Sequence, residues 1–397
     1  MFKIKNYQLY YLISFFNFFI LEITGTSLIL FILDKGYSLQ KANLFMLVMF
    51  FLGLLLEIPT GIVADKLGRK FSTLAGLWIY VLYSFLFTYF HNFIILLLTQ
   101  VLGSLALCLI SGSMEAWIAE NSEKNIETVF STSNSIQYVA GIFCGIIGAY
   151  LASVSYVLPW IVSMIINIVL ILFITVSVKE GRRTNSFDIE KKNSLLDFIK
   201  ESYQFIRKNK YFLPLFFFVF FIGMSNSSAN TFQQPRLVGL SGQGVWIMGY
   251  IKSGYSLFMV LGSVLVKKLT KKNSHIKILR LTCLMLGVWL ILSGIFDSFY
   301  LVLLSFFMYE IGRGMYNPVI QIYTNSLVGD SNRATMLSVQ STFNQLGMCL
   351  GLLITGVISK NFIGIESDQT PIKISWIICG AFALIPLLFM KSKRSKE

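Results

Sequence analysis

Charged side chains inside long apolar stretches are the residues of this sequence that could do chemistry. Glu310 and Arg313 lie three positions apart in "MYEIGRGMYNPVIQIY", and Glu22 lies within an apolar stretch near the start of the chain. A charge in hydrocarbon costs at least about 2.5–3.5 kcal/mol, so such residues are kept for binding, proton transfer or structure. The spacing of Glu310 and Arg313 predicts an ion pair on one helix face, which is either a functional pair or a structural lock.

Other polar residues follow the same stretches at helical spacing and extend these faces. The charged ones are candidates for proton coupling and for lining a central cavity, and they are Glu22, Glu115, Glu310 and Arg313. The amides are candidates for a substrate cavity, and they are Asn17, Gln100, Asn226, Asn230, Gln233, Asn317 and Gln321.

The apolar stretches themselves define the class of protein. Of the 397 residues, 55% are hydrophobic and only 13% are charged, which does not fit one soluble core. Stretches of about 20 apolar residues recur, the length that spans a ~30 Å hydrocarbon layer. They predict an all-α integral membrane protein with twelve transmembrane helices, at about 7–32, 42–64, 71–90, 93–118, 131–153, 158–178, 211–234, 245–266, 279–296, 299–324, 338–358 and 374–390.

Lys and Arg are distributed unevenly between the predicted loops. If residue 1 is cytoplasmic, most of the 33 Lys and Arg lie in cytoplasmic segments, as the positive-inside rule requires. The sequence therefore predicts a multi-pass protein of the cell membrane with both termini in the cytoplasm. The net charge of +14 is assigned to contact with the lipid bilayer, and nucleic acid is excluded as a partner. Lys252, in the outer third of the eighth helix, is expected to extend toward the membrane surface.

A long polar stretch divides the chain into two parts of six helices each. We predict an N-terminal six-helix bundle over 1–178, a cytoplasmic linker with an amphipathic helix over 179–210, and a C-terminal six-helix bundle over 211–397. Glycine spacings repeat between the two halves. Two repeated bundles with a site at the membrane midplane between them are typical of secondary transporters.

Motifs of soluble catalysis are missing from the sequence. It has no phosphate-binding GxxxxGK[ST] segment, and its two His and five Cys show no metal-ligand spacing. We therefore expect neither an enzyme nor an ATP-driven pump, with no metal and no other cofactor.

The stretch "EIPTGIVADKLGRK" follows the second predicted helix and resembles the cytoplasmic loop signature of the major facilitator superfamily. The resemblance covers the whole chain and implies two six-helix bundles. In the family the Asp engages the start of the eleventh helix, here 331–338, and so stabilises the outward-facing state. It implies a conformational switch made of Glu57, Pro59, Gly61, Asp65, Gly68, Arg69 and Lys70. A plain positive-inside anchor is the alternative for the loop, and for Glu57 structural pairing and proton coupling both remain open.

Two further features bear on the direction of transport. The Glu-x-Pro prefix is similar to that of Gram-positive drug exporters such as the clostridial type of tetracycline pump. Gly141, Gly145 and Gly148 in the fifth helix resemble the antiporter motif of exporters, although Ile146 replaces its Pro and Ala149 its final Gly. Glycines at this spacing also serve ordinary helix packing, which is the alternative. Exporters of this group usually carry an Arg early in the fourth helix, and that position is here Thr99.

These features predict a drug:proton antiporter that acts as a monomer. The expected activity is proton-coupled efflux of drug-like or lipophilic small molecules by alternating access, which would give multidrug or antibiotic resistance. The alternative is proton-coupled uptake of a small metabolite or peptide. Acids outnumber Arg313 at mid-depth, which favours neutral or cationic substrates.

Overall fold

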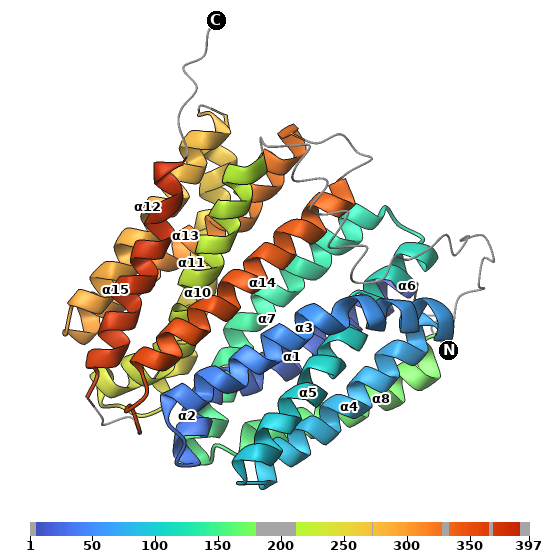
Figure 1. Cartoon of the computed structure of the whole chain (residues 1–397). Coiled ribbons are helices and arrows are strands. Elements are labelled where there is room, and N and C mark those ends of the chain that lie inside the picture. Colours follow the sequence, from blue (N-terminus) through green and yellow to red (C-terminus); the bar gives the residue numbers. More distant parts are fainter. Residues whose placement is uncertain (1–4, 180–211, 272, 328–332, 365–367, 390–397) are drawn as a thin grey trace, which may run out of the picture. The chain divides into compact units, whose positions relative to one another are not determined.

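Helices make up the whole regular structure of the described residues, as the sequence predicts (Figure 1). The computed structural model describes residues 5–179, 212–271, 273–327, 333–364 and 368–389. The helices are α1 (Asn6–Gly25), α2 (Leu28–Asp34), α3 (Leu39–Leu67), α4 (Arg69–Tyr89), α5 (Phe93–Ile110), α6 (Ser113–Asn121), α7 (Ile126–Val154), α8 (Leu158–Ser177), α10 (Leu213–Ser241), α11 (Ile247–Leu269), α12 (His275–Ile295), α13 (Phe299–Leu327), α14 (Arg333–Ile358), α15 (Thr370–Leu384) and the 3₁₀ helix η3 (Ile385–Leu388). The expected linker falls largely on residues 180–211, which lie outside the described residues.

Length and apolarity identify the membrane-spanning helices. Within the described residues, eleven helical segments are long and apolar enough to cross a membrane. The 29-residue α13 is not among them because Glu310, Arg313 and neighbouring polar residues interrupt its apolar sequence. Helices satisfy their own backbone hydrogen bonds, which is why an apolar chain adopts them in lipid. The prediction of an all-α integral membrane protein is confirmed.

Two predicted spans are each divided into two helices. The first is α1 followed by α2, and Thr26 and Ser27 lie at the break. The fourth is α5 followed by α6, where Gly112 adopts a φ of 73°. That left-handed conformation costs a glycine little and would strain most other residues, so the chain changes direction at this point.

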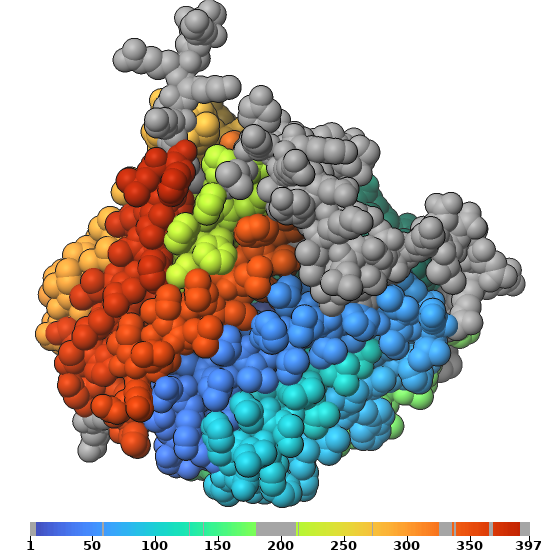
Figure 2. All heavy atoms as spheres, in the orientation of Figure 1, coloured from blue at the N-terminus to red at the C-terminus, as the bar shows by residue number. Residues whose placement is uncertain are grey.

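Two compact units make up the chain, and each unit includes a short segment from the opposite half of the sequence. Unit 1 consists of Met1–Phe31, Val48–Phe198 and Val245–Ser253, and unit 2 consists of Ile32–Leu47, Ile199–Gly244 and Gly254–Glu397. Within unit 1, α1 packs on α7 and α8, and α4 packs on α5, its neighbour in Figure 2. Within unit 2, α10 packs on α14, and α12 packs on α13 and α15.

Hydrogen bonds hold the segment Ile32–Leu47 within unit 2. The buried amide of Asn43 donates to Ser359 Oγ over 3.3 Å and accepts from Thr355 Oγ1 over 3.3 Å. The backbone N–H of Leu39 donates to the Phe362 carbonyl oxygen over 2.9 Å. These three contacts therefore join the start of α3 to the end of α14 and the residues just after it, and all three involve uncharged groups.

A second group of contacts in unit 2 is ionic. Asp297, between α12 and α13, accepts from Lys373 of α15 over 2.7 Å and from the buried Arg236 of α10 over 3.2 Å. These hydrogen bonds, first that from Lys373 and then that from Arg236, lower the pKa of the Asp297 carboxyl below its ordinary value. One carboxylate thus joins α10 and α15 to the loop.

We expect this carboxylate to make unit 2 sensitive to acid. Because its folded-state pKa is lowered, its stabilising contribution is complete above the ordinary carboxyl pKa of about 3.9 and is lost as the pH falls through the lowered value. The Asp297 side chain is 68% exposed, so the contribution is at most about 1 kcal/mol. Thermal unfolding in detergent should show a smaller loss of stability in acid for Asp297→Asn than for the native chain. An identical acid profile in both proteins would contradict the assignment.

Candidate functional site

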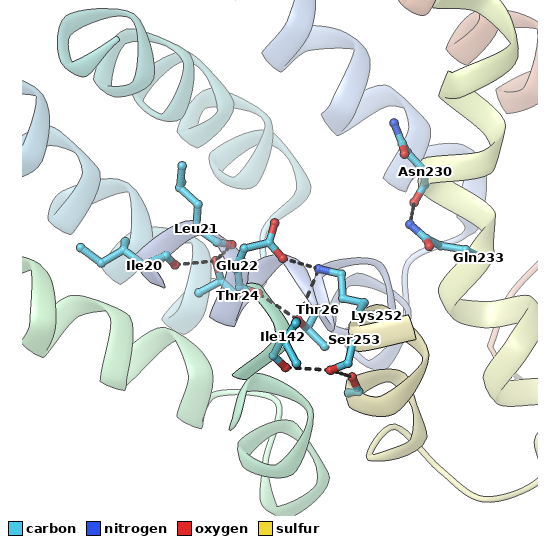
Figure 3. A network of polar contacts seen from close by, with 11 residues as sticks. Ile20, Leu21, Glu22, Thr24, Thr26, Ile142, Asn230, Gln233, Lys252 and Ser253 are labelled. Carbon is cyan, nitrogen blue, oxygen red and sulfur yellow. Dashed lines mark hydrogen bonds and ion pairs between the residues drawn. The ribbon is translucent and has the colours of Figure 1, made fainter. Parts of the chain in front are cut away.

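An ion pair joins α1 to the first turns of α11 within unit 1. Lys252 Nζ lies 2.9 Å from Glu22 Oε2 and 3.4 Å from Thr26 Oγ1. Figure 3 draws the three side chains and marks their contacts with dashed lines. The Lys252 and Glu22 side chains are 17% and 33% exposed. The expectation that Lys252 extends toward the membrane surface is wrong, because a carboxylate in the same apolar surroundings holds its ammonium group.

Close packing of small residues brings these two charges together. A Cβ atom added at Gly148 of α7 would lie 2.6 Å from the Ile23 carbonyl oxygen of α1. One added at Gly249 of α11 would lie 2.8 Å from Ile146 Cα, and one at Gly145 would lie 3.3 Å from Lys252 Cβ. Glycine at these positions therefore lets the backbones of α1, α7 and α11 approach closely.

Hydrogen bonds also join α7 to α11. We call the close contact of α1, α7 and the start of α11 the seam. Ser253 Oγ donates to the Ile142 carbonyl oxygen of α7 over 2.7 Å, a contact drawn in Figure 3. Gly141, Gly145 and Gly148 are all buried along α7. Of the glycines that resemble the antiporter motif, Gly145 therefore faces the segment Val245–Ser253, and Gly148 faces α1.

A second ion pair lies on α13 in unit 2. Arg313 Nη1 donates to Glu310 Oε1 over 2.9 Å, at the i, i+3 spacing that the sequence predicted. The Glu310 side chain is fully buried, whereas that of Arg313 is 25% exposed. Ionised Glu310 depends on this guanidinium, because a buried charge without a partner is strongly destabilising.

Amide and tyrosine side chains connect α13 to its neighbours. The Tyr309 hydroxyl donates to Asn226 Oδ1 of α10 over 2.6 Å. Asn344 Nδ2 of α14 donates to the Tyr316 hydroxyl over 3.0 Å. Sequence reasoning predicted Asn226 as a site residue but missed Tyr309, Tyr316 and Asn344. The sequence signal that pointed to Tyr309 was its position directly before Glu310.

The other predicted cavity residues are placed in different surroundings. Gln100 is fully buried on α5, where its Nε2 donates to the Leu96 carbonyl oxygen over 3.2 Å. Gln233 is buried and donates to the carbonyl oxygen of Asn230, which is itself half-buried. Asn17 is half-buried as well, whereas Glu115, Asn317 and Gln321 are exposed.

The predicted switch loop forms the junction between α3 and α4. Helix α3 continues through Pro59, ends at Leu67, and is followed by Gly68 with a φ of 108°. Arg69 Nη2 lies 2.8 Å from Asp65 Oδ1, and Arg69 Nε lies 3.7 Å from Glu120 Oε1. Glycine is suited to this junction because its positive φ is strained for other residues.

Lys70 binds the carboxyl-terminal end of a neighbouring helix. Its Nζ donates to the carbonyl oxygens of Thr175 over 2.8 Å and Val178 over 2.7 Å. A cation at this end of α8 complements the helix dipole. Glu57 is exposed, and Gly61 lies on α3 with open space where a Cβ atom would be. The segment 331–338, expected to receive Asp65, lies in part outside the described residues.

Metal-binding clusters are lacking in the described part of the chain. No group of three or more His, Cys, Asp or Glu residues there could hold a metal ion.

The sequence of this chain matches known proteins along most of its length. A sequence model described as the Major Facilitator Superfamily matches residues 10–352 and 247–396. The uncharacterized MFS-type transporter YxaM of Bacillus subtilis (strain 168) is 25% identical over 368 residues, which are 91% of this chain and 89% of that protein. The quinolone resistance protein NorA of Staphylococcus aureus (strain MRSA252) is 24% identical over 363 residues, 89% of this chain and 90% of that protein.

Solved structures share the fold at lower sequence identity. The crystal structure of the nucleoside transporter NupG has a TM-score of 0.79 and 15% identity, and the match covers 98% of both chains. A bacterial homologue of the human lysosomal transporter Spinster, in an inward-facing and unoccupied conformation, has a TM-score of 0.78 and 16% identity. That match covers 97% of this chain and 95% of the other.

Proposed function

This chain belongs to the major facilitator superfamily and is a multi-pass secondary transporter, and we propose that it exports drug-like or lipophilic small molecules in exchange for protons. Export would proceed by alternating access across the bacterial cell membrane, with both termini in the cytoplasm. The bundles over 1–178 and 211–397 would move relative to each other about the linker.

The observation that supports this proposal most directly is that two carboxylates inside apolar helices each form an ion pair with a cation. Glu22 pairs with Lys252, and the fully buried Glu310 pairs with Arg313. A carboxylate that gains a proton loses its ion pair, so proton binding can change which helices hold together. Two such carboxylates on separate units supply groups that a proton-coupled transporter needs.

Two observations favour export over uptake. Two glycines of α7 that resemble the antiporter motif of exporters make close contacts, Gly148 with the backbone of α1 and Gly145 with α11. The similarity to NorA, a quinolone resistance protein, extends over 89% of this chain. The drug-exporter type of the superfamily is therefore the subgroup that we propose for this chain.

Transport into everted membrane vesicles tests the direction. In such vesicles the cytoplasmic face is outside, so export is measured as accumulation of a fluorescent lipophilic dye in the lumen. We expect accumulation when the vesicles are energised and release of the dye when an uncoupler is added. Proton-dependent accumulation of a solute by whole cells would instead establish uptake. A growth-inhibition panel, with tetracyclines, macrolides and quinolones first, then identifies substrates.

Asp65 provides a separate prediction about the switch loop. Asp65→Asn removes the carboxylate that binds Arg69 at 2.8 Å, which changes the equilibrium between conformations and leaves substrate contacts intact. We expect the rate of transport to fall severalfold and by a similar factor for every substrate. Initial rates for three chemically unrelated dyes measure this. Selective loss of one dye would show that Asp65 contacts substrate.

A further inference from the structure

We propose that unit 1 binds one phospholipid with an anionic head group, with an acyl chain in an apolar groove between α1 and α8 and the head group on lysines beyond the groove. The side chains that line this α1/α8 groove are Leu12, Phe16, Ile165, Ile166, Val169, Leu170 and Phe173. The inference goes beyond the proposed function, and it depends neither on the direction of transport nor on the coupling ion.

The α1/α8 groove runs along the axes of its two helices. Its residues on α8 include Ile165, Val169 and Phe173, and those on α1 are Leu12 and Phe16. Residues four positions apart lie on one face of a helix, so each helix contributes one continuous wall. From Ile165 to Phe173 the wall is about 12 Å long, at 1.5 Å per residue. Both helices belong to membrane-spanning segments, so the groove has the direction of an acyl chain in the bilayer.

The size and lining of the groove fit a hydrocarbon chain and not a drug-sized molecule. All seven lining side chains are apolar, and the cavity volume is about 200 Å³. Pockets for drug-sized ligands have about 300–1,000 Å³ and include a few polar groups that orient the ligand. None of the amides predicted for the substrate cavity lines this groove. The groove is therefore distinct from the predicted substrate cavity.

The depth of the groove corresponds to one leaflet of the bilayer. Helix α8 ends at Ser177, so Phe173 lies about 6 Å and Ile165 about 18 Å from that end. Half of the hydrocarbon layer is about 15 Å thick. The groove thus extends from near the membrane surface to about the midplane, in the leaflet where α1 begins and α8 ends. In the proposed topology this is the cytoplasmic leaflet.

Three exposed lysines lie at the same end of these two helices. Lys5 directly precedes α1, and Lys179 follows the end of α8. Lys124, in the loop after α6, has its Nζ 4.0 Å from the centroid of the Tyr7 ring in the first turn of α1. The lysines are therefore placed beyond the shallow end of the groove, where the head group of a lipid in the groove would lie.

Helix α6 holds the two chain ends together. Asn6 Nδ2 at the start of α1 donates to the Asn121 carbonyl oxygen over 2.9 Å. Trp117 Nε1, one turn earlier on α6, donates to the Lys179 carbonyl oxygen over 3.0 Å. The start of α1 and the residues after α8 are thus fixed to one short helix, which keeps their lysines at one end of the groove.

The positive charge of these lysines selects the kind of head group. The acids of α6 and the loop after it are Glu115, Glu120 and Glu123, and Glu120 Oε1 lies 3.7 Å from Arg69 Nε. The three lysines together with Arg69 therefore exceed the acids. Each basic residue near a membrane surface strengthens the binding of anionic lipid about fivefold. A phospholipid with a net negative head group is accordingly the expected occupant.

Native mass spectrometry of the purified full chain tests the inference. Delipidated protein in detergent would be titrated with phosphatidylglycerol and, separately, with phosphatidylcholine that carries the same acyl chains. We expect the first phosphatidylglycerol to bind about tenfold more tightly than the first phosphatidylcholine, because only the former has a net negative charge for the lysines.

A substitution in the groove tests the place of the acyl chain. Val169→Trp fills the groove and should weaken binding of the first lipid of either kind about tenfold, the effect of losing about two buried methylene groups. Leu172→Trp is the matched control, because Leu172 lies on the same helix outside the groove. The two side chains are similarly exposed, 59% for Val169 and 62% for Leu172. The control should keep the native affinities.

Substitution of lysines tests the place of the head group. The double variant Lys5→Gln, Lys179→Gln should lose the preference for phosphatidylglycerol and keep the native affinity for phosphatidylcholine. The control is Lys267→Gln, Lys268→Gln, which removes two exposed lysines at the end of α11 and should keep the preference.

Three results would overturn the inference. The first is equal affinity of the native chain for the two lipids, and the second is an equal effect of Val169→Trp and Leu172→Trp. The third is a fluorescent lipophilic dye whose binding is abolished by Val169→Trp but is not reduced by phosphatidylglycerol, because the groove would then be a substrate site. Failure of the vesicles to accumulate dye would refute export alone and leave the lipid site intact.

Discussion

Glu310→Gln is expected to abolish transport and to lower the free energy of unfolding by about 3–5 kcal/mol, the cost of leaving one member of a buried pair alone. The Glu310 side chain is fully buried and accepts from Arg313 over 2.9 Å. A guanidinium stays protonated at any pH that the protein survives, so Arg313 cannot neutralise itself when its partner is removed. Thermal unfolding in detergent and dye transport in vesicles measure the two effects.

A double variant separates function from structure at this pair. Glu310→Gln combined with Arg313→Gln removes both charges and should recover most of the lost stability. Transport should remain absent if the pair exchanges a proton during the cycle. Recovery of transport together with stability would show that the pair is only a structural lock, the alternative that the sequence left open. Native stability in the single variant would contradict the requirement for a partner.

Overpacking of the seam between α1, α7 and α11 should also abolish transport. In Gly148→Ala the new Cβ atom would lie 2.6 Å from the Ile23 carbonyl oxygen, and in Gly249→Ala it would lie 2.8 Å from Ile146 Cα. Backbone atoms cannot turn aside as a flexible side chain can, so the helices must separate, at a cost of about 1–3 kcal/mol. The measurement is dye transport in vesicles.

Substitutions of increasing size at Gly145, with a control substitution on α3, test the same packing in graded steps. Gly145→Ala should be milder, since its Cβ atom would meet Lys252 Cβ at 3.3 Å, whereas Gly145→Leu should impair transport as severely as the two alanine variants. Gly53→Ala on α3 is the control, because its Cβ atom would make an ordinary contact with Ser104 Oγ at 3.7 Å. Equal loss of activity in Gly53→Ala and Gly249→Ala would show that helix rigidity, and not packing of the seam, causes the loss.

The fold could be predicted from the sequence because the bilayer imposes both length and composition on each helix. A stretch such as Leu158–Ser177 has one stable solution in hydrocarbon, so apolarity alone locates it. The breaks within the first and fourth spans were missed, because the short polar groups around Thr26 and Gly112 can also lie inside a continuous helix. Their effect depends on local backbone conformation, which composition does not encode.

The sequence predicted a side-chain contact within one helix but not the contacts between helices. Glu310 and Arg313 share a face through helical periodicity, so their pairing follows from spacing. Glu22 and Lys252 are separated by 230 positions, and their contact depends on how closely α11 approaches α1. That approach is set by Gly148 and Gly249, whose role appears only once the helices are packed. The hydrogen bond from Tyr309 to Asn226 also joins two helices, so the sequence alone does not reveal it.

The exchange of short segments between the halves of the chain has a consequence for biogenesis. The surface of α7 that carries Gly145 and Ile146 is covered by Val245–Ser253, which is synthesised long after α7 has been inserted. Likewise Thr355 and Ser359 find their partner Asn43 on a helix made far earlier. Neither half therefore completes its own surface during translation, and each serves the other as a folding template. Halves produced from separate genes should be degraded when alone and should complement each other when made in the same cell.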